Sequence, residues 1–371
     1  MRWQRWMAIG LYLGLCAAAV CALAGLGRAA DTADEALRGQ FRQLVFAERR
    51  PADLQPRLMR RGEQNGLLEE RVRIVPEAEE EAVVLLLRAP DPPASAAPSR
   101  RPTVLVQHFL GGSKDETTIR MVMLALARQG FLAAAIDGRY RGERQRGKSL
   151  NQAIAEALET GKGHPWLLDT VFDVLRTLDY LVTRPDVDPE RVGILGVSEG
   201  GMIAWMAAAC DERLRAVIPM VAVTRFQDLV DLPLSGGSQP GVELLRPALT
   251  AFARQLGEPE VNARVWRAAW EKLLPGCCDR FEATRLVPTI APRPLLILNH
   301  EQDELIPIAG ARAVYEATRD RYRDLHVEDR LQFRVAPGLK HAATDLAELL
   351  LIGQWLQRWL KPTSGDAAGP Q

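Results

Sequence analysis

The pattern G-x-S-x-G at residues 196–200 constrains the fold of this chain more than any other feature. Residues 191–195 have the short apolar run of a buried strand, and residues 202–209 have the composition of an apolar helix. A sharp turn between the two would hold Ser198 in a strained and exposed position. Glycines at both ends of the pattern fit this prediction, since side chains there would clash where the strand meets the helix. The helix N-terminus after Ser198 would offer unpaired amide groups to a developing negative charge.

The size and charge of the chain exclude some classes of partner. Of its 371 residues, 47% are hydrophobic, which is ample for one large domain with an insertion or for two domains. Lys plus Arg and Asp plus Glu each number 47, so the formal net charge is zero. Because nothing in this balance favours a polyanion, we expect no nucleic-acid partner.

The first 30 residues differ from the rest of the chain. Arg2 and Arg5 precede an uncharged stretch over residues 6–27 that is rich in Ala, Leu and Gly, as in an export signal. We therefore predict a signal peptide over residues 1–30 and an exported protein, periplasmic or secreted. The stretch is also long enough to span a bilayer, so an uncleaved membrane anchor over residues 6–27 is the alternative. We expect contact with a membrane only through such an anchor.

The cysteines do not indicate a disulfide framework. Only Cys210, Cys277 and Cys278 would remain after cleavage. An odd number of cysteines, two of them adjacent, is not the pattern of a fold held together by disulfide bonds. Their spacing also matches no zinc site, so we expect buried free thiols and no metal. A strained bridge between Cys277 and Cys278 is the alternative in an oxidising compartment.

Strand patterns and helix patterns alternate from residue 103 onward. Continuous apolar strands between helices are typical of a mostly parallel sheet that helices cover on both faces, so we predict an α/β fold. The expected strands are 103–107, 131–136, 191–195, 216–220, 294–298 and 331–335, after a hairpin of 71–75 and 82–87, and the expected helices are 116–128, 166–183, 202–209 and 346–360.

The domain organisation follows from this alternation. We expect residues 31–70 to form an N-terminal helical arm and residues 71–360 to form the α/β domain. The segment 224–290 is too long for a simple crossover between strands, and we predict a helical cap that shapes a substrate pocket. Residues 361–371 would form a flexible tail.

A serine hydroxyl is a weak nucleophile unless a base takes its proton and a carboxylate orients that base. In the α/β-hydrolase fold, of which the strand–serine–helix turn is typical, the order along the chain is Ser, then Asp or Glu, then His. His341 follows the last expected strand and precedes the terminal helix, so we predict that it is the base. His326 precedes that strand in a charged stretch, and His300 comes before the expected acid.

The acid is predicted at the end of the strand over residues 294–298. Asp303 follows this strand and precedes an apolar-Pro segment and a new helix, so we choose Asp303 over its neighbours Glu301 and Glu304. For the oxyanion hole, the loop from His108 to Ser113 contains two glycines and follows a strand. The predicted donors are the backbone amides of Glu199 and Leu110.

Several segments resemble the dienelactone hydrolase and acetyl xylan esterase branch of the α/β-hydrolase superfamily, over roughly residues 100 to 360. The segments that carry the resemblance are 108–115, 137–144, 178–181, 186–189 and 291–294. Phe109 departs from the pattern, because such loops often have glycine there, and this leaves the second oxyanion donor open.

The predicted function is a serine hydrolase that cleaves small carboxylic esters through an acyl-enzyme, with Ser198, Asp303 and His341 as the triad. We expect no cofactor. Arg139 and Arg141 could bind an anionic group of the substrate, or they could tie their loop to the core. The alternatives are a serine peptidase or amidase with the same triad, and a non-catalytic exported binding module.

Overall fold

The computed structural model describes residues 31–91, 100–232, 240–341, 343 and 346–361. The predicted signal or anchor segment (residues 1–30) lies outside these residues, as does all but the first residue of the predicted tail. In the part of the chain that is described, no helix combines the length and the apolar character needed to cross a membrane.

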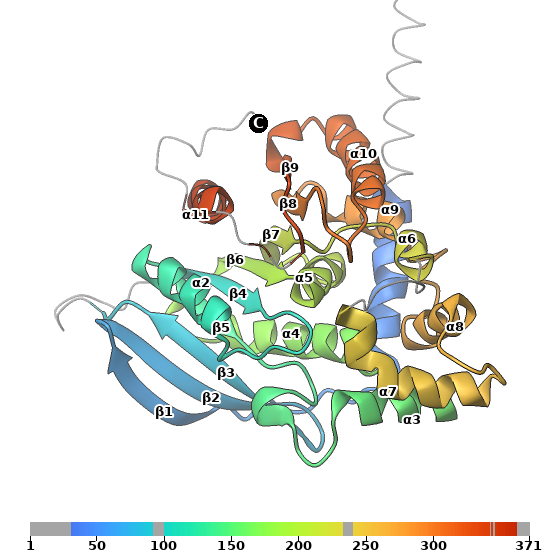
Figure 1. Cartoon of the computed structure of the whole chain (residues 1–371). Helices are drawn as coiled ribbons and strands as arrows, with labels where there is room; N and C mark the ends of the chain where they lie inside the picture. The colour runs from blue at the N-terminus through green and yellow to red at the C-terminus, as the bar shows by residue number, and fades with distance from the viewer. Residues whose placement is uncertain (1–30, 92–99, 233–239, 342, 344–345, 362–371) are drawn as a thin grey trace, which may run out of the picture.

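One nine-stranded sheet forms the centre of the molecule, in the order β1-β2-β3-β5-β4-β6-β7-β8-β9 (Figure 1). The pairs from β5 to β9 are parallel, and β1, β2 and β3 add to the sheet as antiparallel strands. This is the mostly parallel α/β sheet that the alternating pattern predicts. The strands are β1 (Arg57–Gln64), β2 (Leu67–Glu77), β3 (Glu80–Arg88), β4 (Arg101–Gln107), β5 (Leu132–Ala135), β6 (Val187–Val197), β7 (Leu214–Met220), β8 (Leu295–His300) and β9 (Leu331–Ala336).

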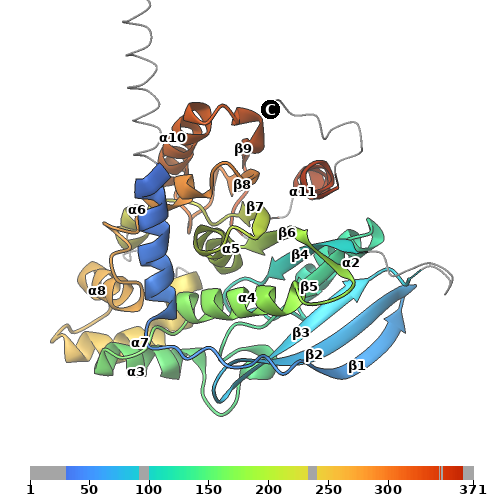
Figure 2. The ribbon, with the colours of Figure 1, turned by 180° about the vertical axis from the view of Figure 1, so that it is seen from behind.

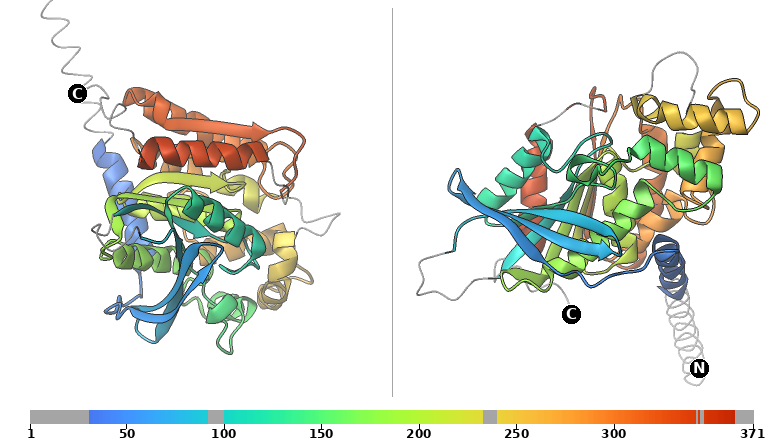
Figure 3. Two further views of the ribbon diagram at one scale, coloured as in Figure 1. Left: turned by 90° about the vertical axis from the view of Figure 1, so that its left-hand side faces the viewer. Right: turned by 90° about the horizontal axis from the view of Figure 1, so that it is seen from below.

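Helices cover both faces of the sheet, and alternate residues of each strand face one layer or the other. In β4, Val104 and Val106 pack under α2 (Thr117–Arg128) and α11 (Leu346–Leu360), which lie on one face (Figure 3). Leu105 packs into the larger core on the opposite face. The helices of that face include α3 (Leu150–Thr160), α4 (Leu167–Leu181), α5 (Glu199–Cys210) and α10 (Ile308–Asp324), and two short 3-10 turns, η1 (Gly142–Arg144) and η3 (Glu328–Arg330), complete the connections.

The N-terminal arm is helical over a shorter length than expected. Residues 31–46 form a helix that packs beside α4, where the ring of Phe46 meets Phe172 edge-on (Figure 2). The predicted helix over residues 31–70 is wrong beyond this point, because β1 begins at Arg57. Most side chains of β1 are exposed, so its ladder with β2, and not a buried apolar face, holds it in the sheet. The expected hairpin is confirmed, since β2 and β3 pair antiparallel.

The chain between β7 and β8 folds as a group of helices. It contains α6 (Phe226–Val230), α7 (Pro240–Gln255), α8 (Ala263–Leu273), α9 (Ala283–Leu286) and η2 (Val287–Ile290). Helix α7 lies beside α3 (Figures 1 and 3), where the amide of Asn151 donates a hydrogen bond of 2.6 Å to the carbonyl of Leu244. This insertion occupies the region that the sequence assigns to a cap.

The junction of β6 and α5 leaves no room for side chains at its two glycines. A Cβ atom at Gly196 would lie 2.0 Å from the carbonyl oxygen of Gly200. A Cβ atom at Gly200 would lie 2.4 Å from the carbonyl oxygen of Gln107, at the end of β4. These neighbours are backbone atoms and cannot turn away, so the pattern needs glycine at both positions.

We predict that Gly200→Ala lowers the free energy of unfolding by about 1–3 kcal/mol or more, because the methyl group overpacks a rigid junction. The measurement is urea denaturation followed by circular dichroism. Gly39→Ala is the matched control: Gly39 is an exposed residue in the helix of residues 31–46, and no atom lies within 4 Å of an added Cβ. Alanine there should be neutral or slightly stabilising. Equal stability of Gly200→Ala and the natural chain would show that the backbone at this junction can move to accommodate a methyl group.

Candidate active site

Ser198 occupies the sharp turn between β6 and α5. Its backbone has φ 56° and ψ −121°, a conformation that non-glycine residues rarely adopt. The turn is held by hydrogen bonds on both sides of the serine, from its own N–H to the carbonyl of Met220 at 2.8 Å and from the N–H of Met202 to its carbonyl at 3.0 Å. The predicted strained position of Ser198 is therefore present in the structure.

The structure brings the three predicted side chains together. The Oγ of Ser198 lies 2.8 Å from Nε2 of His341. On the other side of the ring, Nδ1 of His341 lies 2.8 Å and 3.0 Å from the two carboxylate oxygens of Asp303. Asp303 follows β8 and His341 follows β9, and the carboxyl ends of parallel strands meet at one edge of the sheet. Strand-end position therefore explains why residues far apart in sequence converge.

Asp303 is held rigidly in this arrangement. Its Oδ1 also accepts hydrogen bonds of 2.9 Å from the backbone N–H groups of Leu305 and Ile306. The carboxylate is buried, so these bonds take the place of solvent around its charge. With Nδ1 of His341 donating to Asp303, Nε2 is free to accept the serine proton.

The competing carboxylates bind the backbone around His341. Glu301 accepts a hydrogen bond of 2.8 Å from the N–H of Gly338, and Glu304 lies 3.5 Å from the N–H of His341. Within the described residues, Asp303 is the carboxylate that contacts the imidazole ring. Glu301 and Glu304 instead hold the loop that carries it.

His300 has a supporting position and His326 lies outside the site. The ring of His300 bonds the carbonyl of Lys340 at 2.7 Å and Glu348 of α11 at 3.2 Å. Burial opposes its protonation, but these two hydrogen bonds outweigh burial and raise the pKa of His300. His300 thereby ties the end of β8 to the residue before His341. His326 lies in the turn between α10 and η3.

His108 orients the loop that is predicted to complete the oxyanion hole. The N–H of Gly138 donates to Nε2 of His108 at 3.0 Å, so the ring proton lies on Nδ1, which donates to the carbonyl of Phe109 at 2.8 Å. Burial and the positive charge of Arg141 lower the pKa of His108, which keeps the ring neutral. The backbone N–H groups of Leu110 and Glu199 find no backbone acceptor among the described residues, and both residues line a pocket with Ser198.

The pocket over Ser198 is small and mostly apolar, with a volume of about 80 Å³. The insertion supplies much of its wall, and sequence reasoning did not single out these wall residues. The signals available in the sequence were the prediction that residues 224–290 shape the pocket and the presence of Trp266 and Trp270, four residues apart, within that segment. The pocket is lined by Leu110, Trp166, Ser198, Glu199, Met202, Leu229, Leu232, Leu245, Trp266, Trp270, Leu305, Ile306 and His341.

Arg139 and Arg141 do not line this pocket, and the suggested role in binding a substrate anion is not supported. Both terminal guanidinium nitrogens of Arg141 donate hydrogen bonds of 2.6 Å to the carboxylate of Glu199. Arg139 donates two hydrogen bonds of 2.9 Å to the carboxylate of Asp173. All of these groups are buried, and Glu77 adds a second carboxylate to Arg139 at 2.8 Å. Carboxylates of the protein therefore already occupy both guanidinium groups, which tie the loop to the core and to the residue beside Ser198.

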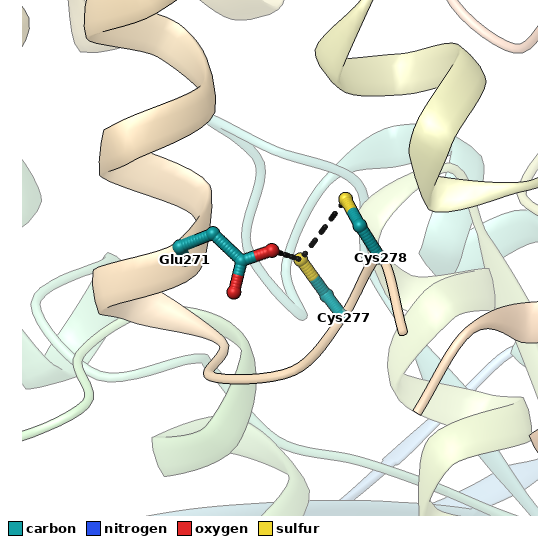
Figure 4. A group of neighbouring side chains, drawn as sticks. All are labelled: Glu271, Cys277 and Cys278. Atoms are coloured by element: carbon teal, nitrogen blue, oxygen red, sulfur yellow. Dashed lines mark hydrogen bonds between the residues drawn. The ribbon is translucent and has the colours of Figure 1, made fainter. Parts of the chain in front are cut away.

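The three cysteines within the described residues are free, as expected. Burial is the main cause that raises the pKa of the Cys278 thiol to about 11, and burial also raises the pKa of Cys277. These two thiols and Glu271 also form one group that could hold a metal ion, which the cysteine spacing alone does not indicate (Figure 4). None of the three lines the pocket over Ser198.

Known proteins with similar sequences or structures include several hydrolases. Residues 92–231 match the dienelactone hydrolase family. The putative hydrolase YtaP of Bacillus subtilis is 27% identical over 271 residues, which cover 70% of this chain and 79% of that protein. Among solved structures, an acetyl xylan esterase from Paenibacillus sp. R4 superposes with a TM-score of 0.61 at 19% identity, over 89% of this chain and 93% of that one. The methylesterase BT1017 gives a TM-score of 0.62 at 19% identity, over 91% of this chain but only 66% of that one.

Fold and family therefore agree with the resemblance found in the sequence. The order of strands and the strand–serine–helix turn are those of the α/β-hydrolase fold, which the similar solved structures share, and residues 92–231 are similar to the dienelactone hydrolase family.

Proposed function

We propose that this protein is a serine hydrolase that cleaves carboxylic esters of small molecules. The observation that carries the proposal is the continuous chain of contacts from Ser198 Oγ to His341 Nε2, and from His341 Nδ1 to Asp303. An ester is favoured because the similar solved structures include an acetyl xylan esterase and a methylesterase. Export of the protein stays a prediction from residues 1–30.

The proposed reaction uses these groups in two similar steps. Ser198 Oγ attacks the acyl carbon while His341 Nε2 takes its proton, and the imidazolium then protonates the departing alkoxide. Asp303 keeps the ring in the required tautomer and stabilises its positive charge. Water, activated by His341, then attacks the acyl-enzyme and releases the carboxylic acid.

The negative oxygen of each tetrahedral intermediate needs donors near Ser198. We assign this role to the backbone N–H groups of Glu199 and Leu110. The first is at the N-terminus of α5, where the helix dipole also favours negative charge. The second belongs to the loop that His108 holds in place.

The pocket supports an acyl group that is compact and uncharged. Its apolar wall and small volume leave no partner for a charge and little space for a long chain. Two of its tryptophans, Trp166 and Trp270, pack with ring centroids 5.1 Å apart, and both indole N–H groups are buried with no acceptor within the described residues.

We predict that Ser198→Ala lowers kcat/KM for 4-nitrophenyl acetate and butyrate by at least about 10⁴-fold, because no other group can form the acyl-enzyme. Initial rates of nitrophenol release measure this with the full chain. A fluorophosphonate probe should label the natural chain and not the variant. Thermal unfolding by circular dichroism checks that the variant is folded. Equal rates in both proteins would rule out Ser198 as the nucleophile.

We predict that Asp303→Asn lowers kcat by about 10⁴-fold, because an amide favours the wrong tautomer of His341. Glu304→Gln and Glu301→Gln are matched controls, since among the described residues near the ring these carboxylates contact backbone N–H groups and not the imidazole. Both should keep activity within about tenfold of the natural chain. A larger loss in Glu304→Gln than in Asp303→Asn would move the acid to Glu304.

We predict that Leu245→Ala shifts acyl preference toward longer chains, because it removes part of the pocket wall. The ratio of kcat/KM for 4-nitrophenyl octanoate to that for the acetate should rise at least about tenfold. Leu249→Ala is the matched control, since Leu249 lies one turn away on α7, is equally buried at 1% exposed, and does not line the pocket. The same ratio in both variants would contradict our placement of the acyl group.

A further inference from the structure

A second group of reactive side chains lies in the insertion, at the end of α8. Glu271 is on the last turn of this helix, and Cys277 and Cys278 are on the turn that follows (Figure 4). The two sulfur atoms lie 3.7 Å apart, and the sulfur of Cys277 lies 3.9 Å from Oε1 of Glu271. All three ligand atoms lie within 4.8 Å of one another.

The backbone of the turn positions these groups. The N–H of Gly276 donates to Oε2 of Glu271 at 3.2 Å, which leaves Oε1 directed at Cys277. The turn is closed by hydrogen bonds from Cys277 N–H to the carbonyl of Leu274 at 3.1 Å and from Phe281 N–H to the carbonyl of Gly276 at 2.8 Å. Gly276 has φ +78°, which a larger residue would adopt only with strain. A carboxylate fixed through its second oxygen is a common feature of metal ligands.

The distances match those of a tetrahedral metal ion. Two thiolates bound to zinc at about 2.3 Å lie about 3.8 Å apart, because the tetrahedral angle fixes the edge between them. A thiolate and a carboxylate oxygen at about 2.0–2.2 Å lie about 3.5–3.7 Å apart by the same geometry. The sulfur pair already has this spacing, and Oε1 of Glu271 is within a few tenths of an ångström of it relative to Cys277. Glu271 and Cys278, whose ligand atoms lie within 4.8 Å of each other, would have to approach by up to about 1.2 Å as the exposed carboxylate turns toward the ion.

We propose that Glu271, Cys277 and Cys278 bind one thiophilic divalent metal ion, with Zn²⁺ as the best match. The buried Cys277 and the half-buried Cys278 supply the two sulfurs, and the exposed Glu271 is on the solvent side. A water molecule fills the fourth position. Two sulfurs and a carboxylate form a donor set that suits Zn²⁺ better than Mg²⁺ or Ca²⁺, which prefer oxygen ligands alone.

Binding exchanges protons for the metal ion. Both cysteines give up their thiol protons to solvent and Glu271 binds as a carboxylate, so two protons leave the thiols as one divalent ion enters. The net charge of the site stays at about −1, and no electrons are transferred. The bound ion would join the end of α8 to the turn before α9. Because α8 also carries Trp266 and Trp270, the ion would stabilise one wall of the pocket.

The test is a titration of the full chain with Co²⁺, which replaces Zn²⁺ and gives visible absorption bands when its site is tetrahedral. The protein is first treated with a chelator and with a phosphine reductant, and then freed of both. We expect one Co²⁺ per chain, strong visible bands with a sulfur-to-metal band in the ultraviolet, and loss of these bands when one equivalent of Zn²⁺ is added. Zn²⁺ should also raise the Tm.

The variants separate this site from other cysteines. Cys277→Ser/Cys278→Ser should lose the bands, and Cys278→Ser and Glu271→Gln should each weaken Co²⁺ binding by at least about tenfold. Cys210→Ser is the matched control: it removes a free cysteine outside the group and should leave the titration unchanged. Cys16 and Cys21 remain in every variant. The proposal is overturned if the reduced natural chain gives no bands, if the double variant keeps them, or if a Cys277–Cys278 disulfide persists in the reductant.

Discussion

The close contact between β6 and α5 is the constraint on which the rest of the site depends. The carbonyl oxygens of Gly200 and Gln107 approach so closely that no Cβ atom fits at the two glycines of the turn. Only this approach lets Ser198 stand at the end of the strand with its backbone at φ 56°. The strain is local and is stabilised by the packing of an almost entirely buried helix against the centre of the sheet. The Ser198 hydroxyl therefore has one fixed position, and the loops that carry Asp303 and His341 converge on it.

Buried ion pairs hold those loops without competing for the substrate. Arg141 binds the side chain of Glu199, while the backbone N–H of Glu199 is left for the proposed oxyanion. Lys114, on the opposite loop, binds Asp137 at 2.7 Å, and the backbone N–H of Lys114 donates to the same carboxylate at 2.8 Å. Each such pair costs desolvation, and breaking one partner would leave a buried charge. The pairs therefore favour a single arrangement of the loops around Ser198.

Local pattern predicted the parts of the site that lie at the ends of strands. Ser198 and Asp303 follow continuous apolar runs and His341 follows an alternating one, all three typical of strands, so their meeting at one sheet edge was predictable. Side-chain partners that come from distant segments could not be predicted in this way. From the sequence, Arg141 could be predicted to bind the substrate. The structure shows that it instead binds Glu199, which is 58 residues away in the sequence. Residues 57–64 have no apolar face, and only pairing with β2 makes them a strand. The cysteine spacing did not indicate the proposed metal site, because its third ligand, Glu271, comes from the preceding helix.

The insertion between β7 and β8 also bears on how this protein could evolve. The proposed triad is fixed by strand ends, whereas Leu229, Leu245 and Trp270 of the pocket wall belong to a segment that leaves the sheet after β7 and rejoins it before β8. Replacements in that segment can therefore alter which molecules fit without displacing the serine, the histidine or the aspartate. Selection for a new substrate can act on one contiguous stretch of the gene while the chemistry stays unchanged.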